Sequence, residues 1–388
     1  MNKVIKIENI TVTIENEYRL LSTELDGENL WFKLPAEIHI NNSAELFVSA
    51  ILLEAMISGR DIEVADDISM SPTLLSQLDK LQRIYHCWNH LLSPIKVIAR
   101  NQQEPTQQPG TASFYSGGVD GSYTLCSHLE EISHLIVISG FDTVEKSEQW
   151  PLLVAKHQAV AAKLNKKLVY IESNLTAFND KRKISRSFQH GLTLAGVAIA
   201  LGFSKVYIPS SFTYSDLFPW GSHPCTDPLW STGTSTIVHD GAETTRSEKT
   251  LAISAVPIVF DNLQVCWKNI AYNCGSCSKC LRTITACYLY NLKSVSIPQL
   301  TNIEVLKNLK LSSTAGEPFF DDLITVATQQ NHSEIVSILK KTQWRFQLKL
   351  HFEAFVNLCT FGKLRKIVRA KRKLQWTQYR VTLSPKTD

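Results

Sequence analysis

The sequence predicts an α/β fold, in which a doubly wound parallel sheet follows a small α+β domain and precedes a helical, basic extension. Short apolar segments alternate with helix-like patterns between residues 110 and 210, and this alternation is typical of parallel strands joined by right-handed crossovers. A polar stretch with Pro and Gly at 101–113 separates this part from the preceding block, and residues 281–375 look helical without a detectable repeat. We therefore expect three units, which comprise residues 1–104, 110–300 and 301–388.

The overall composition is that of a globular chain large enough to bury a substantial core. Of its 388 residues, 44% are hydrophobic and 20% are charged, which excludes a disordered or low-complexity protein. The first residues alternate apolar and polar side chains and lack the apolar core of a signal peptide. The longest nearly apolar run, at 194–203, is about half as long as a membrane span. We expect a cytoplasmic protein without a membrane span.

Positive charge is concentrated at the end of the chain. The formal net charge is +4, but residues 341–388 hold twelve Lys and Arg against two acids, so this tail carries +10 and the body −6. One interpretation is a solvated helical face that docks on the acidic body. The other is a surface for a nucleic acid or an acidic partner. No known nucleic-acid motif accompanies the charges, and the sequence leaves both interpretations open.

The first hundred residues predict strands and two helices but no catalytic group. Residues 5–15 alternate as a half-buried strand does, and 30–35 form a second strand candidate. Apolar residues at helical spacing over 44–58 predict a helix that ends at Gly59, and 73–92 predicts a second amphipathic helix. No Gly-rich loop, metal cluster or nucleophile motif occurs in this part of the sequence.

The central block predicts the parallel sheet. Loops follow its expected strands after Tyr115, Ser139, Glu172 and Ser210. Because ligands of such sheets bind beyond the carboxyl ends of the strands, we expect these loops to form the functional site. The long stretch 211–250 looks mostly irregular and aromatic, which favours either a binding loop for a flat ligand or a packed loop cover. The expected strands are 112–116, 134–139, 167–173 and 205–210, and the expected helices are 122–131, 151–166 and 185–202.

A glycine-rich turn joins the first of these strands to the first helix. Glycine accepts positive φ and lets the backbone approach a ligand, while the helix that follows directs free N–H groups and a partial positive charge at the same point. Serine hydroxyls add donors, so the turn suits an anion such as pyrophosphate. Neither G-x-x-x-x-G-K-S/T nor G-x-G-x-x-G occurs, which argues against kinase-type and dinucleotide sites. The turn comprises Ser116, Gly117, Gly118, Val119, Asp120, Gly121 and Ser122.

Four of the nine cysteines lie within fifteen residues. Cys266, Cys274, Cys277 and Cys280 have the spacing C-x7-C-x2-C-x2-C, which suits tetrahedral coordination of zinc by four thiolates. Four protein ligands leave no open position, so we expect a structural rather than a catalytic metal. An iron–sulfur cluster and redox-active thiols remain alternatives. Arg282, close by in the sequence, can offset part of the thiolate charge.

The motif S-G-G-x-D at 116–120 resembles the phosphate loop of the ATP-pyrophosphatase (PP-loop) superfamily. The resemblance implies a sheet of the adenine-nucleotide α-hydrolase-like type, with ATP and Mg²⁺ at this turn. It also implies that a carboxylate or carbonyl oxygen attacks the α-phosphate, after which pyrophosphate and AMP are released. The serine that follows the aspartate in this superfamily is Gly121 here, with Ser122 next, which is a departure from the pattern.

The turn and the cysteine cluster together resemble 7-cyano-7-deazaguanine synthase-like proteins over about residues 110–290, within a longer layout that has an extra N-terminal domain. Some proteins of this layout are encoded in biosynthetic or anti-phage defence operons. The resemblance implies zinc at the four cysteines. The implied catalytic residues are Asp120, Lys249 and Arg246, and the residues implied to face the adenosine are Gly140, Phe141 and Asp142.

We therefore expect an ATP-dependent ligase that forms a C–N bond, with a small-molecule or peptide carboxylate as substrate and ammonia or an amine as acceptor. A homodimer is the expected assembly. Two alternatives remain. One is a tRNA-modifying enzyme on the same scaffold, favoured only by the basic tail, and the other is a catalytically silent nucleotide-binding subunit, favoured by Gly121. Steeply salt-dependent RNA binding indicates the first, and ATP binding without pyrophosphate release indicates the second.

Overall fold

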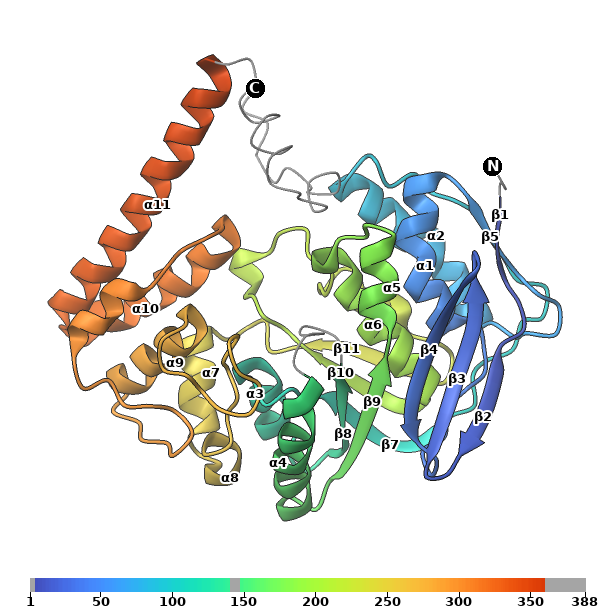
Figure 1. Cartoon of the computed structure of the whole chain (residues 1–388), viewed down its shortest axis with the longest axis horizontal. Coiled ribbons are helices and arrows are strands. Elements are labelled where there is room, and N and C mark those ends of the chain that lie inside the picture. The colour runs from blue at the N-terminus through green and yellow to red at the C-terminus, as the bar shows by residue number, and fades with distance from the viewer. Residues whose placement is uncertain (1–3, 140–146, 360–388) are drawn as a thin grey trace.

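The computed structural model describes residues 4–139 and 147–359 of the chain (Figure 1). This part is a mixed α/β structure with a parallel sheet, so the expected α/β class is confirmed. None of the helices in the two described ranges is long and apolar enough to cross a membrane. The expectations for Gly140, Phe141, Asp142 and the basic segment 360–388 lie outside the described residues.

The structure is built around five parallel strands. These are β7 (Gln108–Phe114), β8 (Ile132–Ser139), β9 (Lys167–Ser173), β10 (Phe203–Pro209) and β11 (Thr236–Asp240). Their spatial order is β11-β10-β7-β8-β9, so the chain places two strands on one side of β7 and then two on the other. This reversal is typical of doubly wound sheets, whose ligands bind beyond the carboxyl ends of the strands at that point. The functional site is therefore expected after β7, β8 and β10.

Hydrophobic cores cover both faces of the parallel strands. Successive side chains of a strand point to opposite faces, so Ile136 joins one core while Leu135 joins the other. On β10, Val206 likewise belongs to the first core and Tyr207 to the second. Several helices contribute to each core. Among them are α1 (Glu45–Ser58) and α6 (Arg186–Leu201) in the first core, and α3 (Val119–Ser127) and α4 (Trp150–Lys163) in the second.

Three antiparallel strands from the N-terminal block extend the same sheet. They are β2 (Thr11–Glu15), β3 (Tyr18–Leu25) and β4 (Glu28–Pro35). Phe32 of β4 pairs with Ser173 of β9, which makes one sheet of eight strands. The N-terminal block is therefore continuous with the parallel sheet at this edge, and Figure 1 shows the two parts side by side.

The remaining N-terminal elements differ in part from the expectation. The single strand expected over 5–15 is wrong, because the chain bends at Asn9, whose φ is 55°. The part before this bend forms a separate three-stranded parallel sheet. Its strands are β1 (Val4–Ile7), β5 (Asp61–Val64) and β6 (Val97–Ile98). Both expected helices are present, and Gly59 ends α1 with φ 65°. The second is α2 (Pro72–Trp88).

The polar stretch expected to be a linker is tied to the body. The Glu104 carboxylate accepts hydrogen bonds from the hydroxyls of Ser71 and Thr73 and from the backbone N–H of Gly233. Strand β7 already begins at Gln108, inside the expected linker. The linker interpretation is therefore wrong for its second half, because backbone pairing in the sheet overrides the local turn propensity of this segment.

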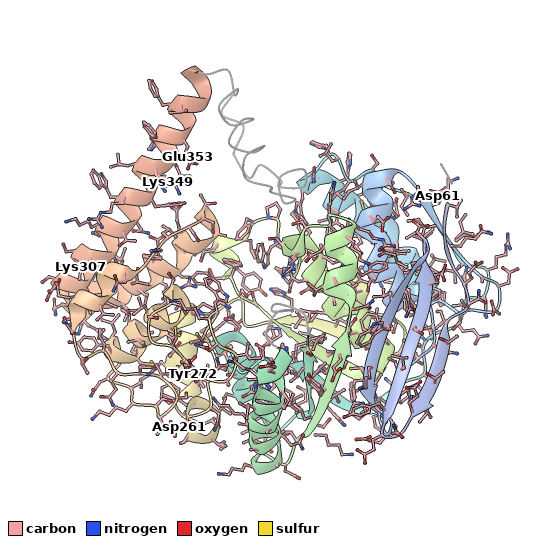
Figure 2. The ribbon with its side chains drawn as sticks, in the orientation of Figure 1. Asp61, Asp261, Tyr272, Lys307, Lys349 and Glu353 are labelled. Carbon is pink, nitrogen blue, oxygen red and sulfur yellow. The ribbon has the colours of Figure 1, made fainter. Side chains whose placement is uncertain are left out.

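Helices dominate the chain after β11, as expected. They are α7 (Arg246–Ile253), α8 (Pro257–Phe260), α9 (Ser278–Leu289), α10 (Glu317–Gln329) and α11 (Ser333–Cys359). Leu281, Phe320 and Leu339 belong to a third core that joins α9, α10 and α11. The later part of α11 projects from the body, and Figure 2 shows Lys349 and Glu353 on it. The short remaining helices are α5 (Leu175–Lys181) and 3₁₀ segments at 147–149, 214–216, 227–230, 303–308 and 314–316.

Candidate functional site

The glycine-rich turn follows β7 at the reversal of the strand order. Gly117 has a φ of 73°, and Gly118 is the N-cap of α3. A Cβ atom on Gly117 would lie 2.8 Å from Nε2 of His157 and 3.3 Å from Cβ of Gln264. Both the positive φ and the lack of space therefore require glycine here. The Gly117 carbonyl also accepts a hydrogen bond of 2.7 Å from the backbone N–H of Gln264, which fixes the turn.

Some of the other residues of the turn line a cavity, and others are buried in the core. Ser116, Asp120 and Gly121 line the cavity, whereas Val119 and Ser122 are fully buried and do not line it. Ser122 therefore does not take the place of the serine that the superfamily has at position 121. A Cβ on Gly121 would lie 3.1 Å from the Phe114 carbonyl oxygen. A serine at this position would need a small shift of the turn, which explains locally why glycine is present.

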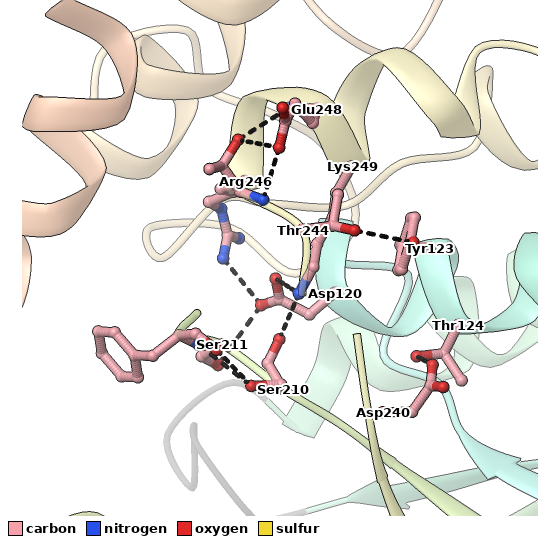
Figure 3. Close-up of polar contacts among 12 residues, drawn as sticks. Asp120, Tyr123, Thr124, Ser210, Ser211, Asp240, Thr244, Arg246, Glu248 and Lys249 are labelled. Atoms are coloured by element: carbon pink, nitrogen blue, oxygen red, sulfur yellow. Dashed lines mark hydrogen bonds and ion pairs between the residues drawn. The ribbon is translucent and has the colours of Figure 1, made fainter. Parts of the chain in front are cut away.

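Arg246 and Lys249, two of the three expected catalytic residues, both contact the third, Asp120. Arg246 Nη1 lies 2.8 Å from Oδ2 of Asp120, and Lys249 Nζ lies 3.8 Å from its Oδ1 (Figure 3). Lys249 Nζ also donates to the Ser210 carbonyl at 2.7 Å, and the Ser211 hydroxyl donates to Asp120 Oδ2 at 3.4 Å. These contacts join the start of α3, the loop after β10 and the start of α7. Asp120 and Arg246 are 126 residues apart in the sequence.

A capping box explains why α7 begins at this point. The Thr245 side chain accepts from the backbone N–H of Glu248, and the Glu248 carboxylate accepts from the backbone N–H of Thr245. This reciprocal pair satisfies two free N–H groups at the helix start. Arg246 and Lys249 follow the cap on the same side of the first turn, because residues three apart are neighbours on a helix. Figure 3 shows both side chains directed at Asp120.

The charges of this cluster are not balanced. Arg246 and Lys249 have side-chain exposures of 16% and 2%, and Arg282 is only partly exposed. Burial acts to raise the pKa of Asp120, but the charges of Arg246 and Lys249 outweigh it and lower that pKa. Burial lowers the pKa of Lys249, which Asp120 counteracts only in part. Burial also lowers the pKa of Arg282 to about 10, and the nearby Arg246 charge adds to this effect.

Helix α10 supports the basic cluster from the C-terminal extension. The Phe319 ring lies 5.5 Å from the guanidinium carbon of Arg246 and 4.5 Å from that of Arg282. Asp322 accepts hydrogen bonds from both the backbone N–H and the hydroxyl of Ser247, at the N-terminus of α7. The roles of Phe319, Asp322 and Arg282 here were not predicted. Arg282 was expected to offset thiolate charge, and the charge of Cys277 does act on it, but its guanidinium also packs on Phe319 beside Arg246.

A cavity of about 240 Å³ opens beside the turn. Its walls come from the ends of β7, β8 and β10 and from α4, α6 and the loop after β10. Trp150 and Trp220 supply flat surfaces, and Leu153 and Leu194 supply apolar ones. The loops after Tyr115 and Ser210 thus reach the cavity, whereas the expected loop after Ser139 lies outside the described residues. The loop after β9 does not, because β4 pairs with β9 there.

The four cysteines converge as their spacing predicts. Their sulfur atoms all lie within 4.8 Å of one another. The Cys274–Cys280 and Cys266–Cys277 sulfur pairs are 4.0 and 3.9 Å apart. Two thiolates on a tetrahedral zinc, each about 2.3 Å from the metal, are separated by about 3.8 Å. The cluster could therefore hold zinc with little rearrangement.

Backbone donors surround the sulfur atoms of this cluster. The N–H groups of Lys268 and Asn269 donate to Cys266 Sγ at 3.2 and 3.3 Å. Ser276 and Cys277 donate in the same way to Cys274. Burial acts to raise the pKa of Cys274, but hydrogen bonds from the Ser276 hydroxyl and from these backbone N–H groups outweigh it and lower that pKa to about 6. Donors of this kind favour the thiolate form that a metal requires.

Three residues of the long loop have the composition of a catalytic triad but a different arrangement. The Ser222 hydroxyl and His239 Nδ1 both bond to the same oxygen of Asp227, at 2.7 and 2.8 Å. The Ser222 hydroxyl lies 3.4 Å from His239 Nδ1, the same nitrogen that bonds to Asp227, whereas a catalytic triad uses the two ring nitrogens separately, so this group is not arranged for nucleophilic catalysis. Asp227 and His239 are almost fully buried, which supports the interpretation of this part of the loop as a packed cover.

No protein-family model, curated protein or solved structure matches this chain. The sequence resemblance described above therefore depends on the two motifs and their spacing. The structure adds the position of the turn at the strand reversal and the basic cluster around Asp120.

Proposed function

We propose that the chain is an ATP-dependent ligase. A carboxylate or carbonyl oxygen of its substrate attacks the α-phosphorus of ATP, the bond between the α- and β-phosphates breaks, and pyrophosphate leaves. Ammonia or an amine then attacks the adenylated carbon, AMP leaves with the substrate oxygen, and the nitrogen loses a proton to solvent. The sequence resemblance and the geometry of the turn support this proposal.

The observation that carries the proposal is the excess of positive charge around Asp120. Arg246 and Lys249 both contact Asp120, and among the described residues neither forms an ion pair with a second carboxylate. Arg282 adds a third positive charge beside Arg246, and Glu243 and Asp240 act on Lys249 without forming ion pairs with it. Burying cations without counter-charges is unfavourable. A polyphosphate would supply the missing negative charge. During the reaction the same three cations would stabilise the charge that develops on the leaving pyrophosphate.

The position of the cluster fits the nucleotide as well. The glycine turn presents the N-terminus of α3, with its free N–H groups, on the side where the cations gather. Asp120 Oδ1 is buried and accepts no hydrogen bond. With ATP bound, this oxygen would be a ligand for Mg²⁺, whose chemistry is to neutralise phosphate charge. The cavity beside the turn has room for the remainder of the ligand.

One observation favours a second candidate, a nucleotide-binding subunit without turnover. Gly121 lacks the hydroxyl found at this position in the superfamily, and Ser122 is fully buried outside the cavity. The turn thus has one donor fewer than the resembled loop. Binding of ATP without cleavage is the behaviour that this loss predicts.

Isotope transfer tests the proposal. The probe is 7-carboxy-7-deazaguanine, the substrate of the resembled family, with ¹⁸O in its carboxylate, supplied with ATP, Mg²⁺ and ammonium. We expect one ¹⁸O atom in the AMP that is released, because the attacking oxygen stays on phosphorus. AMP that contains only oxygen from water would contradict the proposal. Tight ATP binding without any cleavage would favour the silent subunit.

A matched pair of variants identifies the site in the same assay. Lys249→Met removes one buried charge of the cluster, and Lys33→Met removes a lysine on β4, outside the cavity lining. We expect the first to lower the rate of AMP release by about 10²–10³-fold, as the loss of one oxyanion donor does. The second should leave the rate unchanged. Equal rates for both variants would place the chemistry elsewhere.

A further inference from the structure

His157 on α4 is a buried polar group that no role described so far uses. Its side chain has an exposed fraction of 0%, and neither ring nitrogen has a hydrogen-bond partner among the described residues. Buried polar atoms of this kind are rare, because each lost hydrogen bond to water is unfavourable. Burial lowers the pKa of His157 to about 4, so the ring is neutral near pH 7. It then carries one donor and one acceptor.

The imidazole stands between the glycine turn and the cavity. Its Nε2 atom packs against Gly117, its ring meets the Tyr115 ring edge-on at 5.1 Å, and its side chain lines the cavity. Trp150, Leu153 and His157 share one face of α4 by their spacing of three and four residues. The rise of the helix carries this face about 10 Å from the turn to Trp150.

The cavity lining separates charged and uncharged regions. Asp120 is the single Asp, Glu, Lys or Arg among the lining residues of the described chain, and it belongs to the turn. The α4 face beyond the turn offers Leu153 and Trp150 instead. Arg246 and Lys249 contact this carboxylate without lining the cavity, so an anionic group held by them would lie at the turn. A ligand that extends from there into the cavity has a flat, uncharged part along α4. A nucleoside attached to a polyphosphate has this form.

We propose that His157 binds the nucleoside end of the nucleotide, next to the Gly117 turn. One of its ring nitrogens would hydrogen-bond a hydroxyl or ring atom of the nucleoside. This inference rests on the proposed function, because it assumes that the polyphosphate occupies the turn. It adds a residue that discriminates a nucleotide from a bare polyphosphate.

Calorimetric titration with two ligands tests the inference. ATP and inorganic tripolyphosphate, each with Mg²⁺, share the charged end, but only ATP has a nucleoside. For His157→Leu we expect about a tenfold weaker affinity for ATP and an unchanged affinity for tripolyphosphate, because one buried hydrogen bond is lost. His157→Asn and His157→Gln each place an amide near one ring nitrogen. The one that restores ATP affinity identifies the nitrogen involved.

A second histidine variant, His134→Leu, serves as the control for His157→Leu. His134→Leu changes a half-buried histidine near the start of β8, away from the cavity lining. It should leave both affinities unchanged. Unchanged ATP affinity in His157→Leu would overturn the inference, and so would an equal loss for both ligands, which would show that His157 only shapes the turn. If the parent protein binds tripolyphosphate and ATP equally, the nucleoside contact is wrong while the phosphate site stands. If it binds neither ligand, the proposed function fails too.

Discussion

The backbone N–H of Gln264 donates to the carbonyl oxygen of Gly117 at 2.7 Å. Gln264 stands two residues before Cys266, so this bond joins the segment of the cysteine cluster to the glycine turn. On the other side of the cluster, Cys277 is the N-cap of α9, which carries Arg282. The cysteine cluster is thus connected both to the turn and to Arg282, which packs beside Arg246 on the Phe319 ring. A structural metal would therefore affect ligand binding without touching the ligand.

Changing Cys277 to Ser tests this connection. We expect purified parent protein to hold about one zinc per chain and to be colourless. The variant should lose the metal and unfold more easily, because metal binding contributes directly to folding free energy. Its ATP affinity should fall by about fivefold or more through the loosened Gln264–Gly117 bond. Metal analysis, thermal unfolding and calorimetry measure the three effects.

The control for this prediction is Cys225→Ser, which changes an exposed cysteine far from the cluster in sequence. It should keep the metal, the stability and the affinity. A brown protein that contains iron would overturn the assignment to zinc. Full ATP affinity after metal loss would contradict the coupling to the turn.

Gly117→Ala should damage the site more than its backbone strain alone can explain. The alanine Cβ would meet His157 Nε2 at 2.8 Å, at a residue whose φ is 73°. Gly27→Ala is the matched control, because Gly27 has a φ of 77° and nothing within 4 Å of the added atom. Backbone strain should reduce the free energy of unfolding by about 1–3 kcal/mol in each variant, and the contact with His157 should add to the loss in Gly117→Ala. Only Gly117→Ala should weaken ATP binding, and equal affinities in the two variants would contradict this account of the turn.

Asp120→Asn should destabilise the ligand-free protein, because Arg246 and Lys249 lose their counter-charge. Breaking a buried pair from one side costs about 3–5 kcal/mol. Added pyrophosphate should restore much of the lost stability by supplying negative charge. Thermal unfolding with and without pyrophosphate measures both effects. The exposed pair Asp79–Arg83 provides the control, since Asp79→Asn should change neither value measurably.

Asp120→Asn should also change how the stability of the protein depends on pH. The pKa of Asp120 is lower in the folded chain than its ordinary value, so the unfolded chain binds more protons as pH falls through this range. Its contribution to stability is present above about pH 4 and is lost as pH falls through the lowered folded-state pKa. Asp120→Asn should therefore lose less stability than the parent as pH falls from 5 through the lowered folded-state pKa. Identical acid dependence of the two proteins would contradict the ion pair.

Phe319→Ala tests the contribution of the C-terminal extension. Loss of the ring removes the surface on which Arg246 and Arg282 pack, so both side chains gain freedom. We expect polyphosphate affinity to fall by about fivefold, in the range of cation–π energies. Phe355→Ala removes an aromatic side chain that is 63% exposed on α11 and should have no effect on binding. Calorimetric titration with tripolyphosphate compares the two, and equal affinities would contradict the support by α10.

The glycine turn and the cysteine cluster could be predicted from the sequence, because each depends on residues that are close together in the chain. The glycine turn and the four cysteines are each defined by spacing within a few residues, and the strand-helix alternation indicates the sheet that carries them. Arg246 and Lys249 were expected through the resemblance. The structure brings both to Asp120, although more than 120 residues separate them in sequence.

The remaining parts depend on packing between distant segments. Phe319 reaches Arg282 only because α10 folds back on α9, and no pattern around Phe319 indicates this. His157 looks like an ordinary helix residue until Gly117 is placed beside it. Strand β11 was missed inside 211–250, because its short segment becomes a strand through pairing with β10. The extension of the sheet by β4 likewise depends on a long-range pairing with β9.

The position at which ATP is cleaved tests the central claim most directly. The assay uses ATP labelled at the α-phosphate with Mg²⁺, ammonium and 7-carboxy-7-deazaguanine, and separates the nucleotide products by chromatography. The account predicts that the label appears in AMP, together with an equal amount of pyrophosphate, and that Lys249→Met suppresses both. Label in ADP, with release of inorganic phosphate, would contradict adenylation.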